Sequence, residues 1–176
     1  MQFSKLRKAT TLFIGFVIVL VFCAVGLNAQ QPTEISGEIT AAVTHQDSII
    51  VGDVTSHKIS LMVSEGTNVN TGEHEFMDGA EIVNMSHSDL IQGNGVNQGY
   101  VRFTKGGDTT FGEWQGMIKT KVMPEGDPVT TLEGTYIYIK GTGSFENIKG
   151  EGTFEGEFTS KTEYTVKWQG SYFIEE

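Results

Sequence analysis

Residues 150–174 read GEGTFEGEFTSKTEYTVKWQGSYFI, and this stretch decides the fold class. Glycine, aromatic and aliphatic residues alternate along it with charged and polar residues. A period of two is typical of β-strands that bury one face, because successive side chains point to opposite sides of a sheet. Lys161 and Thr162 interrupt the pattern, which predicts a hairpin of strands at residues 150–160 and 163–174. Glycine beside large rings on one face indicates a small barrel, where rings need empty positions opposite them.

The same period of two extends back to residue 35, and no helical spacing lasts longer than two turns. Six more strands are predicted, at residues 35–45, 56–65, 79–92, 99–105, 109–123 and 129–141. One face of the strand at 109–123 carries Thr110, Gly112, Trp114, Gly116, Ile118 and Val122, which predicts that this face is inward. Short turns join each predicted strand to the next one in the sequence. The predicted fold is therefore all-β, an eight-stranded antiparallel meander closed into a small barrel.

The first 29 residues have the layout of a secretory signal peptide. Lys5, Arg7 and Lys8 precede an apolar run at residues 12–25, and cleavage is predicted after Ala29. The run is shorter than the roughly 20 residues that span a bilayer, so we expect no stable membrane insertion after cleavage. The predicted domains are a signal peptide at 1–29 and a single β-barrel domain at 30–176. The expected location is secreted or periplasmic.

Cys23 lies inside the predicted signal peptide and is the one cysteine of the chain. Lipidation of Cys23 is a less favoured alternative, because the bulky Phe22 precedes it. Cleavage would leave no cysteine in the mature protein. We therefore expect stability to come from the core and from a closed hydrogen-bond network rather than from disulfides.

The charge balance excludes one class of partner. The chain has 12 Lys and Arg against 22 Asp and Glu, with a net charge of −10 and a pI near 4.8. Such a protein repels phosphate and gains nothing from counterion release, so we expect no nucleic-acid partner.

A glycine-rich corner provides a resemblance to a known family. Residues 141–145 read GTGSF, and residues 148–154 follow with IKGEGTF. The same pattern includes residues 89–95, 99–100, 107–108 and 114–116. The similarity covers most of residues 35–174. The chain resembles the allene oxide cyclase and dirigent group of calycin-like barrels, in a bacterial branch. Lipocalins match less well, because their Gly-x-Trp signature is missing from residues 35–45.

This resemblance implies an eight-stranded barrel, often trimeric, whose cavity receives an apolar or phenolic molecule. It also implies that the cyclases of the group act by shape and a few polar groups, with no cofactor. The early strands carry no motif that matches the active residues of the plant cyclases. The resemblance therefore assigns no catalytic residue to this chain.

Two groups of residues are candidates for a site. The inward aromatic residues predicted to contact a ligand are Trp114, Phe154, Phe158, Trp168 and Tyr172. Asp89, Tyr100 and Arg102 are weak catalytic candidates, because with His87 they would converge if their two strand faces formed one wall. The alternative is an exposed cross-strand ion pair that contributes little. The sequence leaves open whether the interior is filled or hollow.

Other chemistry finds little support in the sequence. The four histidines, at positions 45, 57, 74 and 87, form no His-x-His pair and no helical i, i+4 pair around a glutamate, so we expect no metal site. There is no Gly-x-Ser-x-Gly motif, and the glycine-rich segments open no helix that would bind phosphate. We expect no cofactor.

Three functions remain after these exclusions. The leading hypothesis is a secreted barrel that binds a small apolar or aromatic molecule in its interior. The alternative is a cofactor-independent cyclase or isomerase of the allene oxide cyclase and dirigent type, and the third is a filled barrel that acts through its acidic surface. A cavity would favour the first two, and a charged group that reaches it would favour the enzyme.

Overall fold

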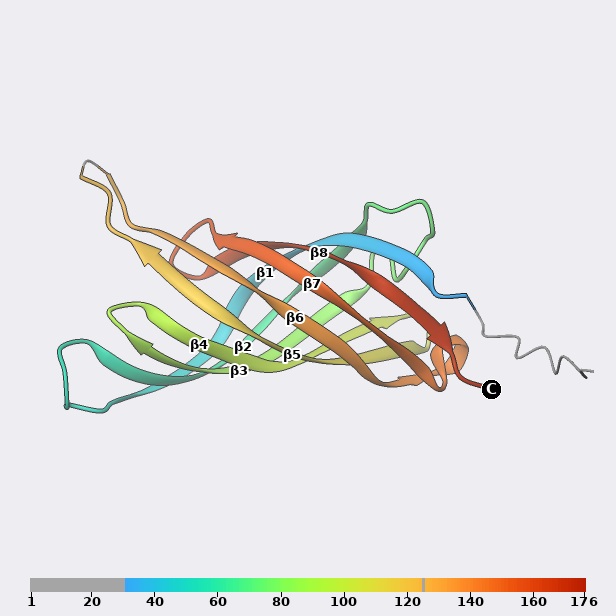
Figure 1. Ribbon diagram of the computed structural model, residues 1–176, viewed down its shortest axis with the longest axis horizontal. Helices are drawn as coiled ribbons and strands as arrows, with labels where there is room; N and C mark the ends of the chain where they lie inside the picture. The colour runs from blue at the N-terminus through green and yellow to red at the C-terminus, as the bar shows by residue number, and fades with distance from the viewer. Residues whose placement is uncertain (1–30, 125) are drawn as a thin grey trace, which may run out of the picture.

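The computed structural model describes residues 31–124 and 126–176. In this part of the chain, eight strands and one short 3-10 helix follow one another: β1 (Thr33–Ile50), β2 (His57–Asn70), β3 (Glu81–Ile91), β4 (Asn94–Lys105), β5 (Asp108–Lys121), β6 (Val129–Thr142), η1 (Gly143–Phe145), β7 (Ile148–Phe158) and β8 (Glu163–Ile174). Each strand pairs antiparallel with the next, and β8 pairs with β1 to close the barrel (Figure 1). The predicted fold class is confirmed.

The predicted signal peptide at residues 1–29, with its cleavage position and Cys23, lies outside the described residues. Within the described residues, no helix has the length and apolar character that crossing a membrane requires.

The first two strands are longer than predicted. β1 continues to Ile50 and β2 to Asn70, about five residues beyond the expected ends. A register shift between Val43 and His45 interrupts the alternation of inward and outward side chains. The second half of β1 therefore does not continue the period of two that predicts the first half. Past Ala42, β1 pairs with β2 and no longer with β8. The β1–β2 hairpin therefore projects beyond the closed part of the barrel (Figure 1).

The barrel has two different ends. The connections β1–β2, β3–β4, β5–β6 and β7–β8 lie at one end, which we call the hairpin end. The other three connections and both ends of the described chain lie at the opposite end, which we call the closed end (Figure 1). Two of the turns are two-residue loops in which both residues have positive φ, Gln92–Gly93 and Gly106–Gly107. Such loops match the twist of the paired strands and fix their register.

The predicted inward faces of β5, β7 and β8 are confirmed by burial. Trp114 and Trp168 are 8% and 5% exposed. The rings occupy space that glycines leave free: a Cβ on Gly37 would lie 2.4 Å from the Trp168 ring, and one on Gly134 would lie 2.6 Å from the Phe154 ring. The predicted inward position of Val122 is wrong. β5 ends at Lys121, so Val122 lies in the following loop and is 82% exposed.

A loop fills the closed end of the barrel. Residues 71–80 connect β2 to β3 and place Phe76 and Met77 in the interior. The side chain of Asn68 holds this loop, because its Nδ2 donates hydrogen bonds to the carbonyl oxygens of Phe76 and Met77, at 3.3 and 2.9 Å. Phe76 is fully buried and contacts five aromatic rings, those of Phe103, Tyr138, Phe145, Trp168 and Tyr172. The closed end is therefore a solid aromatic core.

Candidate functional site

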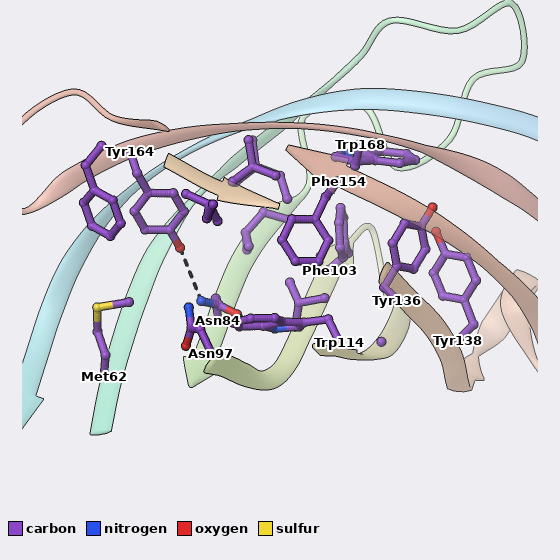
Figure 2. Close-up of a pocket in the computed structure, with 17 residues that line it drawn as sticks. Met62, Asn84, Asn97, Phe103, Trp114, Tyr136, Tyr138, Phe154, Tyr164 and Trp168 are labelled. Carbon is purple, nitrogen blue, oxygen red and sulfur yellow. Dashed lines mark hydrogen bonds between the residues drawn. The ribbon is translucent and has the colours of Figure 1, made fainter. Parts of the chain in front are cut away.

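A cavity of about 80 Å³ lies inside the barrel, on the hairpin side of the packed rings. A single water needs roughly 10 to 15 Å³ of such space, and pockets for drug-sized ligands are roughly 300 to 1,000 Å³. The interior is thus largely filled and keeps room for a small molecule. The cavity is lined by Ile39, Met62, Ile82, Asn84, Asn97, Val101, Phe103, Gly112, Trp114, Leu132, Tyr136, Tyr138, Phe154, Phe158, Tyr164, Val166 and Trp168 (Figure 2).

Strands β5 to β8 supply an aromatic wall. The rings of Trp114 and Phe154 meet edge to face, with centroids 5.6 Å apart. Phe158 packs against Tyr164 in a tilted arrangement, with centroids 5.4 Å apart. Such pairs fix ring positions by their quadrupoles as well as by buried area. The wall is therefore built of rings in defined orientations.

Strands β2 to β4 supply a partly polar wall, and its centre is Asn84. The indole Nε1 of Trp114 donates a hydrogen bond to Asn84 Oδ1 at 2.9 Å, and Asn84 Nδ2 donates to the Tyr164 hydroxyl at 3.3 Å. Tyr164 also shares a hydrogen bond with the fully buried Ser64. Burial raises the pKa of the Tyr164 hydroxyl, which keeps this network neutral.

Two polar atoms of the lining have no hydrogen-bond partner among the described residues. They are Oδ1 of Asn97 and the hydroxyl of Tyr136, on side chains from β4 and β6. Asn97 is 6% exposed and Tyr136 is 8% exposed. Burial raises the pKa of Tyr136 to about 12, so its hydroxyl stays protonated at neutral pH. Buried polar groups are nearly always bonded, so these two atoms are exceptions in the interior of the barrel.

None of the described side chains that line the cavity is charged. A charged guest would lose its hydration without gaining an ionic partner, which is strongly unfavourable. The arrangement is suited to a neutral molecule.

Four of the five predicted ligand-contacting residues line the cavity, namely Trp114, Phe154, Phe158 and Trp168. Tyr172 does not. Its ring packs against Phe76 and Phe145 at the closed end, with centroids 5.2 and 5.9 Å apart. The alternation along β8 correctly places Tyr172 inward, but the loop at residues 71–80 occupies the space in front of it.

The structure does not bring the catalytic candidates to the cavity. Asp89, Tyr100 and Arg102 lie on the outer face of the barrel, where all three are exposed. Asp89 accepts a hydrogen bond from His57 Nε2 at 2.7 Å, and Asp53 accepts one from the opposite ring nitrogen of His57. Tyr100 lies opposite Met85 on β3, and Arg102 lies opposite Val83. Their strand faces form one wall, as the hypothesis required, but that wall faces solvent.

The sequence reasoning missed Asn84, Asn97 and Tyr136. The signal for the first was available, because Asn84 shares a period of two with the apolar Ile82. Charged residues are the usual markers of chemistry, and the titratable His87 and Asp89 lie on the opposite face of β3. Asn97 lies in a segment predicted as a turn, four residues outside the structure's own turn at Gln92–Gly93.

No protein-family model matches this chain, and no curated protein matches it. Solved structures similar to this chain include two of low identity. One is the pterocarpan synthase dirigent protein PsPTS1, with a TM-score of 0.47, 15% identity and coverage of 84% of this chain and 97% of that one. The other is the pterocarpan synthase dirigent protein GePTS1, with a TM-score of 0.44, 14% identity and coverage of 94% of this chain and 100% of that one.

Proposed function

We propose that this barrel binds a small, neutral, apolar or aromatic molecule in its interior cavity. The observation that carries the proposal is the aromatic lining without a charged group. Trp114, Phe154, Phe158 and Trp168 would contact the guest through their ring faces and edges. Burial of apolar surface supplies the affinity, at about 25 cal/mol per Å² removed from water.

The size of the cavity restricts the guest. An engineered apolar cavity of roughly 150 Å³ binds benzene, and this cavity is about 80 Å³. We therefore expect a guest no larger than a single small ring. A six-membered ring requires a lining side chain to move, and the half-buried Met62 is unbranched and can adapt to it.

An enzyme that moves protons is less well supported. The lining offers amides and tyrosine hydroxyls, and burial raises the pKa of Tyr136 to about 12 and that of Tyr138 well above its ordinary value. Such groups exchange few protons near neutral pH. A cyclase that only folds its substrate would need no such group, and turnover of the bound molecule would distinguish it from a binding protein.

Tryptophan fluorescence tests the proposal directly. Trp114 and Trp168 are the two tryptophans of the chain and both line the cavity, so their emission should respond to a guest that enters it. We expect saturable emission changes and a higher melting temperature with thiophene or benzene. The bulkier tert-butylbenzene should have neither effect.

A variant that fills the cavity is the control. Val101 lines the cavity from β4, and Val101→Phe should remove the response to thiophene while the protein still melts cooperatively. Emission and melting temperature that stay unchanged for the native protein at saturating thiophene and benzene would contradict the proposed function.

A further inference from the structure

The second half of β1 has an edge that no strand of the described residues covers. β1 pairs with β8 only from Thr33 to Ala42, and from His45 to Ile50 it pairs with β2 alone. The Val43 amide still donates a hydrogen bond to the carbonyl oxygen of Thr162 in the β7–β8 turn, so the free edge begins at Thr44. This part of the β1–β2 hairpin projects beyond the closed part of the barrel (Figure 1). Such an edge is a template for pairing with another extended strand.

The backbone groups of every second residue point to this free edge. The Val51 amide donates a hydrogen bond to the carbonyl oxygen of His57 on β2, at 3.1 Å. Residues of an antiparallel strand direct their backbone groups alternately to its two sides, so those of Gln46, Ser48 and Ile50 point away from β2. A strand laid along the edge would therefore meet donors and acceptors at ladder spacing.

The side chains along the edge are complementary to a second copy of themselves. His45 and Asp47 lie on the same face of β1, where His45 Nε2 and Asp47 Oδ2 are 2.9 Å apart and both side chains are mostly exposed. A two-fold axis at right angles to the sheet can set Gln46 opposite Gln46 of a second copy. His45 of each copy then lies opposite Asp47 of the other. Two such cross-strand pairs of histidine and carboxylate stabilise the antiparallel arrangement.

The same two residues disfavour the neighbouring registers. A shift by two residues is the smallest that keeps the same faces together. In one direction it sets Asp47 opposite Asp47 of the second copy, and like charges directly opposite each other are destabilising. In the other direction it sets His45 opposite His45 and leaves both carboxylates without a cross-strand partner. The edge therefore favours one register.

We propose that two copies of this chain form a symmetric dimer through β1, in an antiparallel ladder centred on Gln46 with His45 of each copy opposite Asp47 of the other. A two-fold contact uses the same edge on both copies and closes on itself, so assembly through this edge stops at two. The interface is small, which predicts a weak dimer that depends on concentration. The pairing does not depend on what the cavity binds.

Sedimentation equilibrium of the native protein tests the dimer, at concentrations from about 1 µM to 1 mM, where weak interfaces dissociate. We expect a monomer–dimer equilibrium. His45→Asp sets carboxylates opposite each other at both pairs and should raise the dissociation constant at least about tenfold. The double variant His45→Asp with Asp47→His exchanges the two partners and should restore the native constant to within about threefold.

Gln46→Pro provides a second test, because it removes the amide hydrogen at the centre of the ladder. That amide points away from β2, so the variant should keep a melting temperature close to the native value and stay monomeric. Ile137→Ser is the control. Ile137 is exposed on the outer face of β6, away from the edge, and its replacement should leave the dimer unchanged.

Several results would overturn the proposal. A native protein that is monomeric up to about 1 mM has no such dimer, and a trimer is incompatible with a two-fold contact. A dimer that His45→Asp leaves intact, or that the double variant fails to restore, does not use the register centred on Gln46. A dimer that Ile137→Ser dissociates forms through the outer face of the barrel and not through the edge of β1.

Discussion

The two ends of the barrel interior are built from the same strands and are packed differently. At the closed end, Phe76 meets five aromatic rings and is fully buried. On the hairpin side, Phe158 and Met62 stay half-buried around a cavity of about 80 Å³. The difference comes from a connection, because the loop at residues 71–80 enters the closed end. The turns at the opposite end include a hairpin that projects away from the barrel (Figure 1).

This comparison shows that strand alternation alone does not decide whether a barrel is solid or hollow. Tyr172 and Trp168 both face inward from β8 and are four residues apart. Tyr172 is covered by Phe76, whereas Trp168 contacts Phe76 and also lines the cavity. Removing the covering ring should therefore convert the solid end into a second cavity.

The largest expected effect is that of replacing one phenylalanine at each end by alanine. Phe76→Ala should lower the free energy of unfolding by about 3 to 5 kcal/mol, because a fully buried ring is lost from rigid surroundings. Phe158→Ala should cost about half as much, since its ring is already part exposed and borders free space. Denaturant unfolding of the two variants measures the difference.

Glu73→Ala is the control for Phe76→Ala, because Glu73 lies exposed in the same loop and its removal should change the free energy by less than about 0.5 kcal/mol. Equal losses for Phe76→Ala and Phe158→Ala would mean that the two ends are packed alike. The contrast between a solid and a hollow end would then be wrong.

The sequence predicts the strand order and the inward faces because both depend on local alternation. Glycines that alternate with polar residues on one strand, and rings that do so on its neighbour, predict the inward faces, as for Gly37 and Trp168. The loop at residues 71–80 has no such pattern in its sequence. Phe76 and Met77 lie there beside Asp78 and other charged residues, a composition typical of exposed turns. Their burial depends on Asn68, eight residues before Phe76.

The candidate site was predictable only in part for the same reason. The aromatic wall follows from alternation, and four of its predicted members line the cavity. The volume left between the walls depends on the sum of many side chains from all eight strands and on the loop that enters from one end. Which asparagine each indole reaches depends on the tertiary structure and leaves no local pattern in the sequence.

A smaller effect should separate the two ends by pH. His57 donates hydrogen bonds to Asp53 in the β1–β2 turn and to Asp89 on β3, so the hairpin end is held by an ionic cluster where the closed end is held by rings. These hydrogen bonds to the two carboxylates, Asp53 first, raise the pKa of His57 above 6.5, and the bond to His57 lowers the pKa of Asp53 below 3.8. The cluster therefore contributes its full stabilisation between about pH 3.8 and pH 6.5.

The direction of each pKa shift decides whether stability is lost as the pH rises or as it falls. Because the folded pKa of His57 is raised, its contribution is fully present below about pH 6.5 and is lost as the pH rises through the folded value. Because the pKa of Asp53 is lowered, its contribution is lost as the pH falls below 3.8 through the folded value. We expect the melting temperature of the native protein to exceed that of His57→Gln most between pH 5 and 6, with a difference that declines toward pH 9.

Asp89→Asn removes the negative charge of one of the two carboxylates that bond to His57, and it should reduce the pH dependence without abolishing it. Phe76→Ala should leave the dependence as it is in the native protein, because that ring packs against other aromatic rings. A melting-temperature difference between the native protein and His57→Gln that stays constant from pH 5 to pH 9 would rule out an ionised His57 in the cluster.

The smallest expected effect concerns one hydroxyl on the boundary between the two ends. The Tyr136 hydroxyl has no hydrogen-bond partner among the described residues, and it lies where Gly152 and Gly170 leave room for it. Tyr136→Phe deletes this hydroxyl and keeps the ring, so the free energy of unfolding should stay the same or rise by up to about 1 kcal/mol. Tyr164→Phe is the matched change, because the Tyr164 hydroxyl bonds to Ser64 and Asn84, and it should lose about 1 to 2 kcal/mol. Denaturant unfolding without ligand compares the two. An equal loss for both variants would mean that the Tyr136 hydroxyl is bonded as firmly as that of Tyr164, and the boundary between the two ends would then hold no unbonded hydroxyl at this position.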